Sequence, residues 1–431
     1  MTCVLRARPI FTLVAIVISV LAQAPMRPLD AGGANPDRSG GWPQWRGPRR
    51  DGISTETALN LNWQVREPAR LWQAPLGTGF SSIAVRDGRA YTLAADGNSE
   101  FVVCLDGAEG DTIWKVPTGA AAYRDAQGGD GPRCTPTLDG DRVYALGATG
   151  KLLCLDVQSG AVIWSRDVLE EFGAENLHWG VSASPLIDGN RLFVGVGAKG
   201  ASIVALDKQT GEVIWQALDD AAGYAAPIRI DVAGPDGLMV PEIVFFCGKS
   251  LVGVSPEDGA EHWRHEFITT SDMNIATPIY DPATRILFVS AARDTGRCEA
   301  YRLTARGETV EPELVYTNKE MRNHYNSCVL VDGYLYGFDN SLLKCMKLET
   351  GEVMWQDRSV GKGSLIAANG HLLVLGEKGD LALVETTPAG YQEKGRIKAL
   401  ESDRAWSPPA LAEGRLYVRD LKNMACIDLA P

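Results

Sequence analysis

One short motif recurs along this sequence, and its repetition constrains the fold more than any other feature. The stretch CLDVQSGAVIW ends at Trp164, CLDGAEGDTIW ends 50 residues earlier at Trp114, and ALDKQTGEVIW ends 51 residues later at Trp215. A fixed period of this length is typical of repeat architectures. In each hairpin the Asp can accept backbone N–H groups in an Asx turn, and the Gly can take the left-handed conformation. We therefore interpret the motif as structural and not catalytic.

A second element precedes the hairpin in each copy: an apolar pair, an Asp-Gly-like turn and a short apolar strand, as in CTPTLDGDRVY. Its copies begin at Ser81, Cys134, Ala183, Ala225, Ala276, Asn326, Ser364 and Ser407. With the hairpin, each unit then holds four short strands joined by tight turns. Units of this kind are typical of a propeller, in which four-stranded sheets stack around an axis. The sequence predicts an all-β fold, an eight-bladed β-propeller of four-stranded antiparallel blades.

The two ends of the repeat region predict how the ring closes. The last copy stops at MACIDLAP, after its third strand, and ARLWQAPLG near the start supplies a strand without a blade of its own. Pairing these N- and C-terminal strands would complete the eighth blade and remove an open sheet edge. The fifth and seventh copies lack the Leu-Asp turn, and the fourth carries the insertion DVAGPDGLMVPE, which we expect to form an extended hairpin. The predicted framework residues are Trp72, Asp106, Trp114, Asp156, Trp164, Asp207, Trp215, Trp263, Trp355 and Asp428.

The N-terminus has the pattern of a signal peptide over residues 1–24. Arg6 and Arg8 precede an apolar core, and Ala22–Ala24 has the small-x-small form of a cleavage site. We expect export to the periplasm or cell envelope, and no lipoprotein anchor, since no Cys follows the apolar core. Pro25 disfavours cleavage, so the alternative is an uncleaved anchor, which is the one membrane contact that we expect.

The rest of the chain divides by composition. Residues 25–40 are predicted to be a flexible linker, and residues 41–70 form a Trp-rich leader that we expect along the outside of the ring. Residues 71–431 make up the predicted propeller. The formal net charge of −12 at pH 7 would repel phosphate backbones, so a nucleic-acid partner is not expected.

Four cysteines occupy one repeat position: Cys104, Cys154, Cys345 and Cys426. Other copies have Ala205 and Gly253 there, so the position selects a small side chain in a packed strand. Equivalent positions on neighbouring sheets should lie about 10 Å apart, which is too far for a disulfide. We expect these four to be free buried thiols. The pairing of Cys134, Cys247, Cys298 and Cys328 stays open.

The repeat ALDxxTGxxxW resembles that of the pyrroloquinoline-quinone (PQQ) family of propellers, which includes quinoprotein alcohol dehydrogenases and BamB-type outer-membrane assembly factors. The resemblance runs from Trp72 to the C-terminus, and WPQWRGPRRDGIS and ENLHWGVSASPL resemble a BamB-like subgroup of exported bacterial proteins. The resemblance implies the propeller fold. Because the repeat framework is complete and no catalytic set is assembled, we expect an exported, non-catalytic, BamB-like scaffold that binds a protein or peptide of the cell envelope. The alternative is a PQQ- and calcium-dependent oxidoreductase.

Residues just before the first strand of each blade should converge on a funnel at the axis. They are Phe80, Arg133, His178, Trp179, Tyr224, Asn274, His324, Asn326, Lys362 and Trp406. A concave mouth with aromatic and hydrogen-bonding groups is a candidate ligand site, and a small ligand or carbohydrate is a second alternative to a protein partner. The opposing interpretation is that these side chains only fill the axis.

The oxidoreductase alternative needs more than a funnel. The family's enzymes hold the quinone against a Trp, with calcium bound by carboxylate and amide oxygens and an Asp as base. This chain has no adjacent Cys pair, and the nearest carboxylates in sequence are Asp125, Asp130, Glu175 and Asp272. Calcium takes six to eight oxygens. We therefore expect no metal site, no cofactor and no catalytic residues. His262 and His265 do not change this, because residues three apart on a strand point to opposite faces.

Overall fold

The computed structural model describes residues 1–2, 41–125, 129–292, 295–402 and 404–431. Apart from the first two residues, the predicted signal peptide and linker lie outside these ranges. The chain divides into two units, Met1–Asn35 and Pro36–Pro431, and the second is described below. Its helices are α1 (Val168–Phe172) and η2 (Thr270–Asp272). Within the described ranges, no helix has the length and apolar character needed to cross a membrane.

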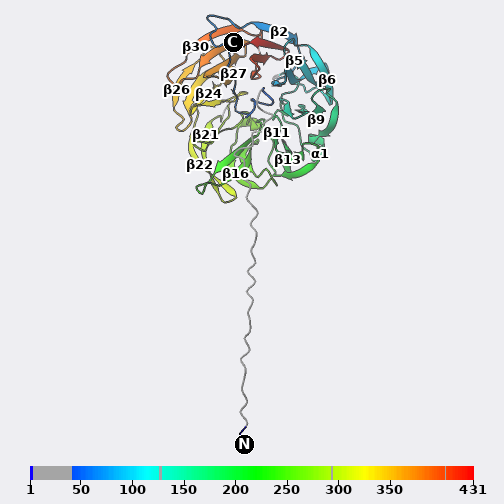
Figure 1. Ribbon diagram of the computed structural model, residues 1–431, viewed down its shortest axis with the longest axis vertical. Coiled ribbons are helices and arrows are strands. Elements are labelled where there is room, and N and C mark those ends of the chain that lie inside the picture. The colour runs from blue at the N-terminus through cyan, green and yellow to red at the C-terminus, as the bar shows by residue number, and fades with distance from the viewer. Residues whose placement is uncertain (3–40, 126–128, 293–294, 403) are drawn as a thin grey trace. The chain divides into compact units, whose positions relative to one another are not determined.

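The described residues form eight sheets arranged in a ring (Figure 1). Each sheet has four antiparallel strands, and the sheet of blade 7 has a short parallel fifth strand, β1 (Ile53–Ser54). Blades 1 to 4 comprise β3 (Ala84–Arg86), β4 (Arg89–Asp96), β5 (Ser99–Asp106) and β6 (Thr112–Ala121); β7 (Thr137–Asp139), β8 (Arg142–Leu146), β9 (Lys151–Asp156) and β10 (Val162–Asp167); β11 (Leu186–Asp188), β12 (Arg191–Ala198), β13 (Ala201–Asp207) and β14 (Val213–Ala217); β15 (Ile228–Ala233), β16 (Met239–Phe246), β17 (Ser250–Val254) and β18 (Glu261–Glu266).

The ring continues in the same order of strands. Blades 5 to 8 comprise β19 (Ile279–Asp281), β20 (Ile286–Ser290), β21 (Cys298–Arg306) and β22 (Thr309–Asn318); β23 (Val329–Val331), β24 (Tyr334–Asp339), β25 (Leu342–Lys347) and β26 (Val353–Asp357); β27 (Gly363–Ala368), β28 (His371–Gly376), β29 (Asp380–Glu385) and β30 (Glu393–Lys398); β31 (Ala410–Ala412), β32 (Arg415–Arg419), β33 (Asn423–Asp428) and β2 (Arg70–Pro75). The eight-bladed all-β prediction is confirmed.

The ring closes as the sequence predicts. In blade 8, β2 pairs antiparallel with β33, and Trp72 lies opposite Cys426. The first propeller strand thus becomes the outermost strand of the last blade. The insertion in the fourth copy extends the β15–β16 hairpin, whose last pair is Ala233 with Met239. This prediction is confirmed as well.

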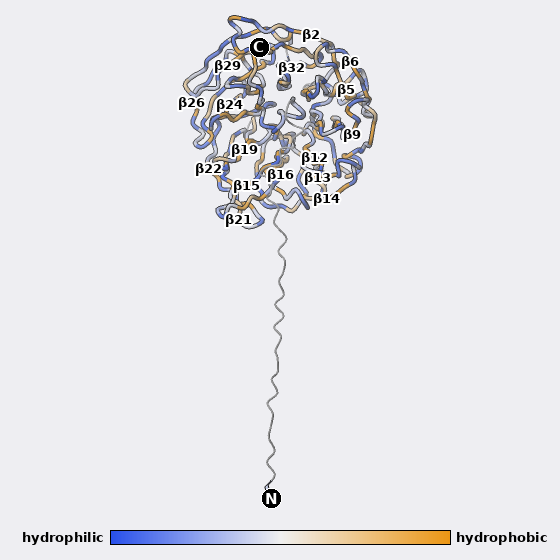
Figure 2. Tube along the Cα trace, viewed as in Figure 1, coloured by the Kyte–Doolittle hydropathy of each residue, from blue (hydrophilic) through white to orange (hydrophobic). Residues whose placement is uncertain are grey.

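The core lies between the blades. Middle strands such as β5 and β9 are buried almost along their whole length, because each sheet is covered on both faces by its neighbours. Hydrophobic residues accordingly recur in the strands all around the ring (Figure 2). All eight cysteines of the described ranges are buried and free. The prediction for the four repeat-position thiols is confirmed, and the four open cases are also unpaired.

Every repeat Trp except Trp263 donates a hydrogen bond from its blade to the next one. The indole Nε1 of Trp114 donates to the carbonyl of Val157 at 3.3 Å, and Trp164 donates to Lys208 at 3.2 Å. The indole ring of the Trp also lies against the turn glycine of the next blade. A Cβ added at Gly160 would come within 2.8 Å of the Trp114 side chain. Gly160 has a φ of +71°, so the turn needs glycine both for its backbone conformation and for the space that the Trp takes. The preceding Asp caps the turn, as where Asp156 Oδ1 accepts the N–H of Ser159 at 2.8 Å.

In blade 4 the repeat Trp finds its hydrogen-bond acceptor within its own blade, because the fifth copy lacks the turn that would accept this bond. The Nε1 of Trp263 donates to Glu242 Oε2 at 2.6 Å, and His262 Nδ1 lies 3.0 Å from Glu242 Oε1. Glu242 is fully buried and reaches past Gly253 on the strand between them. A Cβ at Gly253 would lie 2.1 Å from the Trp263 Nε1. This contact explains why the small-residue position holds Gly here.

The leader does not follow the outside of the ring, so that expectation is wrong for its first half. Trp42 exchanges two backbone hydrogen bonds of 2.8 Å with Val85 in the innermost strand of blade 1. Strand β1 (Ile53–Ser54) pairs parallel with β27, the innermost strand of blade 7. Figure 1 shows this start of the described chain, in dark blue, in the middle of the ring.

Two buried arginines of the leader bind backbone carbonyls just ahead of the inner strands of blades 3 and 6. Arg50 donates to the carbonyls of Ser184 and Pro185, both at 2.9 Å, and Arg46 donates to the carbonyl of Cys328. The innermost strands have one unpaired edge, and buried backbone groups there need partners. The leader supplies them, which is the physical reason for its place in the channel.

The second half of the leader runs out of the channel. The carboxylate of Glu56 accepts the N–H groups of Glu413 and Gly414 in the first turn of blade 8, at 2.6 and 2.8 Å. Asn60 then donates its N–H to Leu429, and Trp63 is buried against Gly395. The leader therefore leaves on the face opposite the loops that enter the first strands.

Candidate functional site

A cavity of about 250 Å³ lies at the axis, on the face where the loops enter the first strands. Six of the ten predicted funnel residues line it: Phe80, Arg133, Trp179, Tyr224, His324 and Trp406. Trp45 of the leader also lines it, as do Tyr325, Met273 and Ile275. The structure thus brings together side chains from the entry loops of seven blades and from the leader.

Three stacked rings form one wall. Trp406 from blade 8 has Phe80 on one side, with centroids 5.2 Å apart, and Tyr325 on the other, at 4.8 Å. Both pairs are nearly parallel, at 17° and 20°. The enclosed Tyr325 hydroxyl has no hydrogen-bond partner among the described residues. Burial also raises the pKa of this phenol.

Blades 3 and 4 supply the other side of the cavity. Trp179 lies 5.7 Å from the ring of Tyr224 and 4.6 Å from His178, which meets it edge-on. Burial raises the pKa of Tyr224 to about 12, so its hydroxyl stays protonated at neutral pH. The predicted residue His178 is exposed at the rim and does not line the cavity.

Arg133 brings a fixed positive charge. Its guanidinium donates to the carbonyls of Gly131 at 2.7 Å and Gly129 at 2.9 Å, and lies 3.7 Å from the carboxylate of Asp125. Burial lowers its pKa, but a guanidinium remains charged at physiological pH. The charge also lies 5.5 Å from the ring of Phe80.

A second positive group stands beside the stacked wall. The Nζ of Lys362 lies 2.5 Å from His324 Nδ1 and 4.6 Å from the centroid of Tyr325. A lysine at this distance over an aromatic face is a cation–π contact. Lys362 does not itself line the cavity, although His324 does.

Asn274 and Asn326 do not reach the cavity. Asn274 is fully buried, and its amide donates to the carbonyls of Cys247 at 2.7 Å and Phe267 at 3.1 Å. The amide of Asn326 donates to the carbonyl of Gly363. Both side chains hold loop backbone in place.

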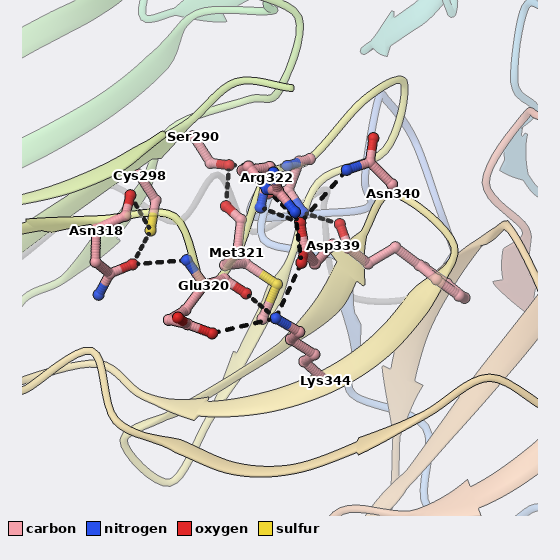
Figure 3. A network of polar contacts seen from close by, with 11 residues as sticks. Ser290, Cys298, Asn318, Glu320, Met321, Arg322, Asp339, Asn340 and Lys344 are labelled. Atoms are coloured by element: carbon pink, nitrogen blue, oxygen red, sulfur yellow. Dashed lines mark hydrogen bonds and ion pairs between the residues drawn. The ribbon is translucent and has the colours of Figure 1, made fainter. Parts of the chain in front are cut away.

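The loop that carries His324 and Tyr325 is clamped by a polar network (Figure 3). Asp339 accepts from Arg322 Nε at 2.8 Å and pairs with Lys344 Nζ at 2.9 Å. Lys344 also donates to the carbonyl of Glu320 at 2.8 Å. Burial by itself raises the pKa of Asp339, but the hydrogen bonds and charges of Arg322 and Lys344 outweigh it, so the pKa is lowered. The network anchors the loop between blades 5 and 6.

Sequence reasoning missed Trp45 and Tyr325. Tyr325 lies directly between two predicted residues, so it could have been found by including every residue of that loop. Trp45 is less clearly indicated by the sequence. It lies in a leader that is rich in arginine and tryptophan and that matches no copy of the repeat. Its Nε1 donates to Thr277 Oγ1 at 2.9 Å, which fixes the ring at the floor of the cavity.

The described lining supplies aromatic surface and a positive charge, which are groups that bind a ligand. No Asp or Glu is among the described residues that line the cavity. Of the carboxylates nearest in sequence, Asp125 pairs with Arg133 and Asp130 pairs with Arg124. Within the ranges that the structure describes, no three His, Cys, Asp or Glu side chains are grouped as metal ligands. This donor set does not fit the calcium that accompanies the quinone in the PQQ enzymes.

The sequence is similar to that of a known family of propeller proteins. The family model described as "Outer membrane protein assembly factor BamB" matches residues 62–172 and 98–357. The factor of that name from Yersinia pestis is 22% identical over 303 residues, which is 67% of this chain and 72% of that protein. The one from Shewanella oneidensis is 22% identical over 376 residues, 74% of this chain and 90% of that protein.

Solved structures show the same fold. The crystal structure of BamB from Moraxella catarrhalis matches with a TM-score of 0.57 and 16% identity, covering 84% of this chain and 99% of that one. The quinohemoprotein alcohol dehydrogenase from Comamonas testosteroni matches with a TM-score of 0.52 and 12% identity, covering 92% and 81%. At these identities the likeness concerns the fold alone.

Proposed function

Because the chain belongs to the family of PQQ-like propellers described as outer membrane protein assembly factor BamB, we propose that it is an exported, non-catalytic scaffold of the cell envelope. It binds a protein or peptide partner. The observation that carries this proposal is the family match, which spans most of the blades. Relatives that match over two thirds of this chain bear the same name.

The cavity on the face where the loops enter the first strands is better suited to binding than to catalysis. Aromatic walls and fixed cations surround the cavity, and the described lining has no carboxylate to act as a base. Loops on a rigid scaffold are the usual place for recognition. The partner is a protein of the envelope and not a nucleic acid, in keeping with the net charge of −12.

The division of the chain follows from the same proposal. Residues 1–24 direct export without a lipid anchor, residues 25–40 link to the ring, and residues 41–70 precede the propeller of residues 71–431. Placing the leader in the channel makes it part of the folded body. Mass spectrometry of the exported protein would show whether cleavage occurs after Ala24.

Site-specific photo-crosslinking tests the binding function. A photoreactive residue at His178 samples the loop face, because that side chain is exposed beside the cavity. The matched control is Gln209, an exposed residue of a turn on the opposite face. In intact envelopes we expect a discrete adduct from position 178 that Trp406→Ala removes, and none from position 209. Equal labelling from both positions, or none from either, would contradict the proposal.

A titration distinguishes the scaffold from a quinoprotein dehydrogenase. Purified mature protein is mixed with PQQ and Ca²⁺, followed by absorbance and by dye-linked alcohol oxidation. We expect no saturable calcium-dependent binding and no turnover, since the cavity lacks the oxygen ligands that calcium takes. Alcohol oxidation that Trp406→Ala abolishes would contradict the scaffold function and show that the protein is an enzyme.

A further inference from the structure

The stacked wall of the cavity carries positive charge as well as flat aromatic surface. Trp406 lies between Phe80 and Tyr325, with centroids 5.2 and 4.8 Å away. The ammonium of Lys362 lies 5.7 Å from the Trp406 ring, and the guanidinium of Arg404 lies 6.0 Å from it. A group that packs against the ring edges of this wall would therefore lie close to cations.

Arg133 places a further cation on the neighbouring part of the lining. Its side chain is 12% exposed, and glycine carbonyls fix its orientation. One carboxylate, Asp125, lies 3.7 Å from it. Cations thus cluster at the axis of a chain whose net charge is −12. The described lining itself contains Arg133 and no carboxylate, although Asp125 lies beside Arg133 and Glu377 accepts from the Trp406 Nε1 at 3.3 Å. The charge that faces the cavity is therefore positive and favours acidic groups at this mouth.

The leader sets the depth of the cavity. Trp45 forms part of its lining, and the strand that follows fills the channel beside β27. A pocket closed in this way does not let an extended chain pass through the ring. At about 250 Å³ it is also smaller than the roughly 300–1,000 Å³ of sites for drug-sized ligands. Its size suits one aromatic side chain inserted as an anchor, which is how hot-spot pockets work.

This inference rests on the proposed function. We propose that the axial cavity receives an aromatic side chain from an internal segment of the partner, flanked in the partner's sequence by Asp or Glu. The ring packs against the wall around Trp406, and the flanking carboxylates pair with Arg133 and Lys362. Aromatic anchors supply contact area, and the charge pairs supply selectivity and a salt-dependent association.

Isothermal titration with short capped peptides tests the chemistry without knowledge of the partner. The probes are acetyl-Gly-Glu-Phe-Glu-Gly-amide, the same peptide with Gln in place of Glu, and the same peptide with Ala in place of Phe. We expect the Glu-Phe-Glu peptide to bind about tenfold more tightly than the Gln peptide at low salt. Added salt should narrow that difference, and the Ala peptide should not bind.

Variants assign the two halves of the recognition. Trp406→Ala should abolish binding of both Phe peptides, whereas Arg133→Gln should remove most of the preference for Glu over Gln. Lys362→Gln is a second charge variant in case Arg133→Gln disturbs its glycine loop. The matched control is Arg306→Gln, because this exposed arginine lies in the outer hairpin of blade 5. Melting temperatures verify that each variant is folded.

Four results would overturn the inference. Equal binding of the Glu and Gln peptides would remove the acidic preference, and a folded Trp406→Ala variant with normal binding would move the site elsewhere. Free 3-phenylpropionate binding as tightly as the peptide would make this a site for small aromatic acids. If the peptides fail while crosslinking from position 178 still captures a partner, this inference falls and the proposed function stands.

Discussion

The indole of Trp45 donates to the hydroxyl of Thr277 at 2.9 Å, which joins residues 232 positions apart in the sequence. Trp42, three residues earlier, pairs with Val85 in blade 1, and Thr277 begins blade 5 on the opposite side of an eight-bladed ring. The leader therefore spans the axis. It connects blades on opposite sides of the ring, and it provides one lining residue of the candidate site.

Arg46 should be the most costly residue of the leader to remove. It is 3% exposed and donates to the carbonyls of Arg50 at 3.1 Å, Asp51 at 2.8 Å and Cys328. We expect Arg46→Ala to destabilise the protein by about 3 kcal/mol, since buried acceptors lose a charged donor. Thermal unfolding measures this. Arg49→Ala is the control: that side chain is 54% exposed, and its loss should cost under about 1 kcal/mol.

Gly160 tests the contact between blades 1 and 2. With Ala at this position the Cβ would lie 2.8 Å from Trp114, and the φ of +71° disfavours any side chain. The comparison variant is Gly140→Ala, since Gly140 has a φ of +54° but nothing within 4 Å of the added Cβ. We expect Gly160→Ala to lower stability by about 1–3 kcal/mol more than Gly140→Ala, as overpacking does. Equal losses would mean that backbone strain alone selects glycine.

Glu242 should make stability depend on pH. Burial raises its pKa, and the hydrogen bonds from Trp263 and His262 do not outweigh that effect. A carboxyl whose pKa is raised on folding stabilises the native state below its ordinary pKa, and this contribution is lost as pH rises through the folded value. We expect Glu242→Gln to flatten the fall in melting temperature as the pH rises above the ordinary pKa of a Glu side chain. Glu308→Gln, at an exposed position, should leave that slope unchanged.

Asp339 should link stability to the shape of the cavity. Asp339→Asn leaves the ammonium of Lys344, whose side chain is 5% exposed, without its buried carboxylate. We expect a loss of about 3 kcal/mol and weaker binding at the loop that carries His324 and Tyr325. Because the pKa of Asp339 is lowered, its contribution is present above the ordinary pKa of Asp and is lost as pH falls.

The control for this network is Glu320→Gln. The Glu320 side chain is 52% exposed, and its carboxylate lies 3.3 Å from Lys344. Its charge should be worth under about 1 kcal/mol. If both substitutions have equally small effects on unfolding, the buried pair does not clamp the loop.

Much of the candidate site followed from the repeat, because equivalent loops must converge on one axis. That argument brought Phe80, Trp179 and Trp406 to the cavity. The same argument does not distinguish side chains that point into the cavity from those that point into the surrounding backbone. For this reason it predicted Asn274 and Asn326 as funnel residues. Both are buried amides that hold loop backbone. Which way a loop side chain points depends on neighbouring blades, and no local pattern encodes it.

The blades and their closure follow from the amino-acid sequence. A four-stranded unit with apolar residues on both faces must stack on copies of itself, and a missing last strand must be replaced by an early one. The place of the leader does not follow from any local pattern, because unpaired backbone groups along the channel exist only once eight inner strands surround an axis. Trp45 and Arg46 then find partners far away in the chain, and these contacts shape the cavity on which the proposed binding depends.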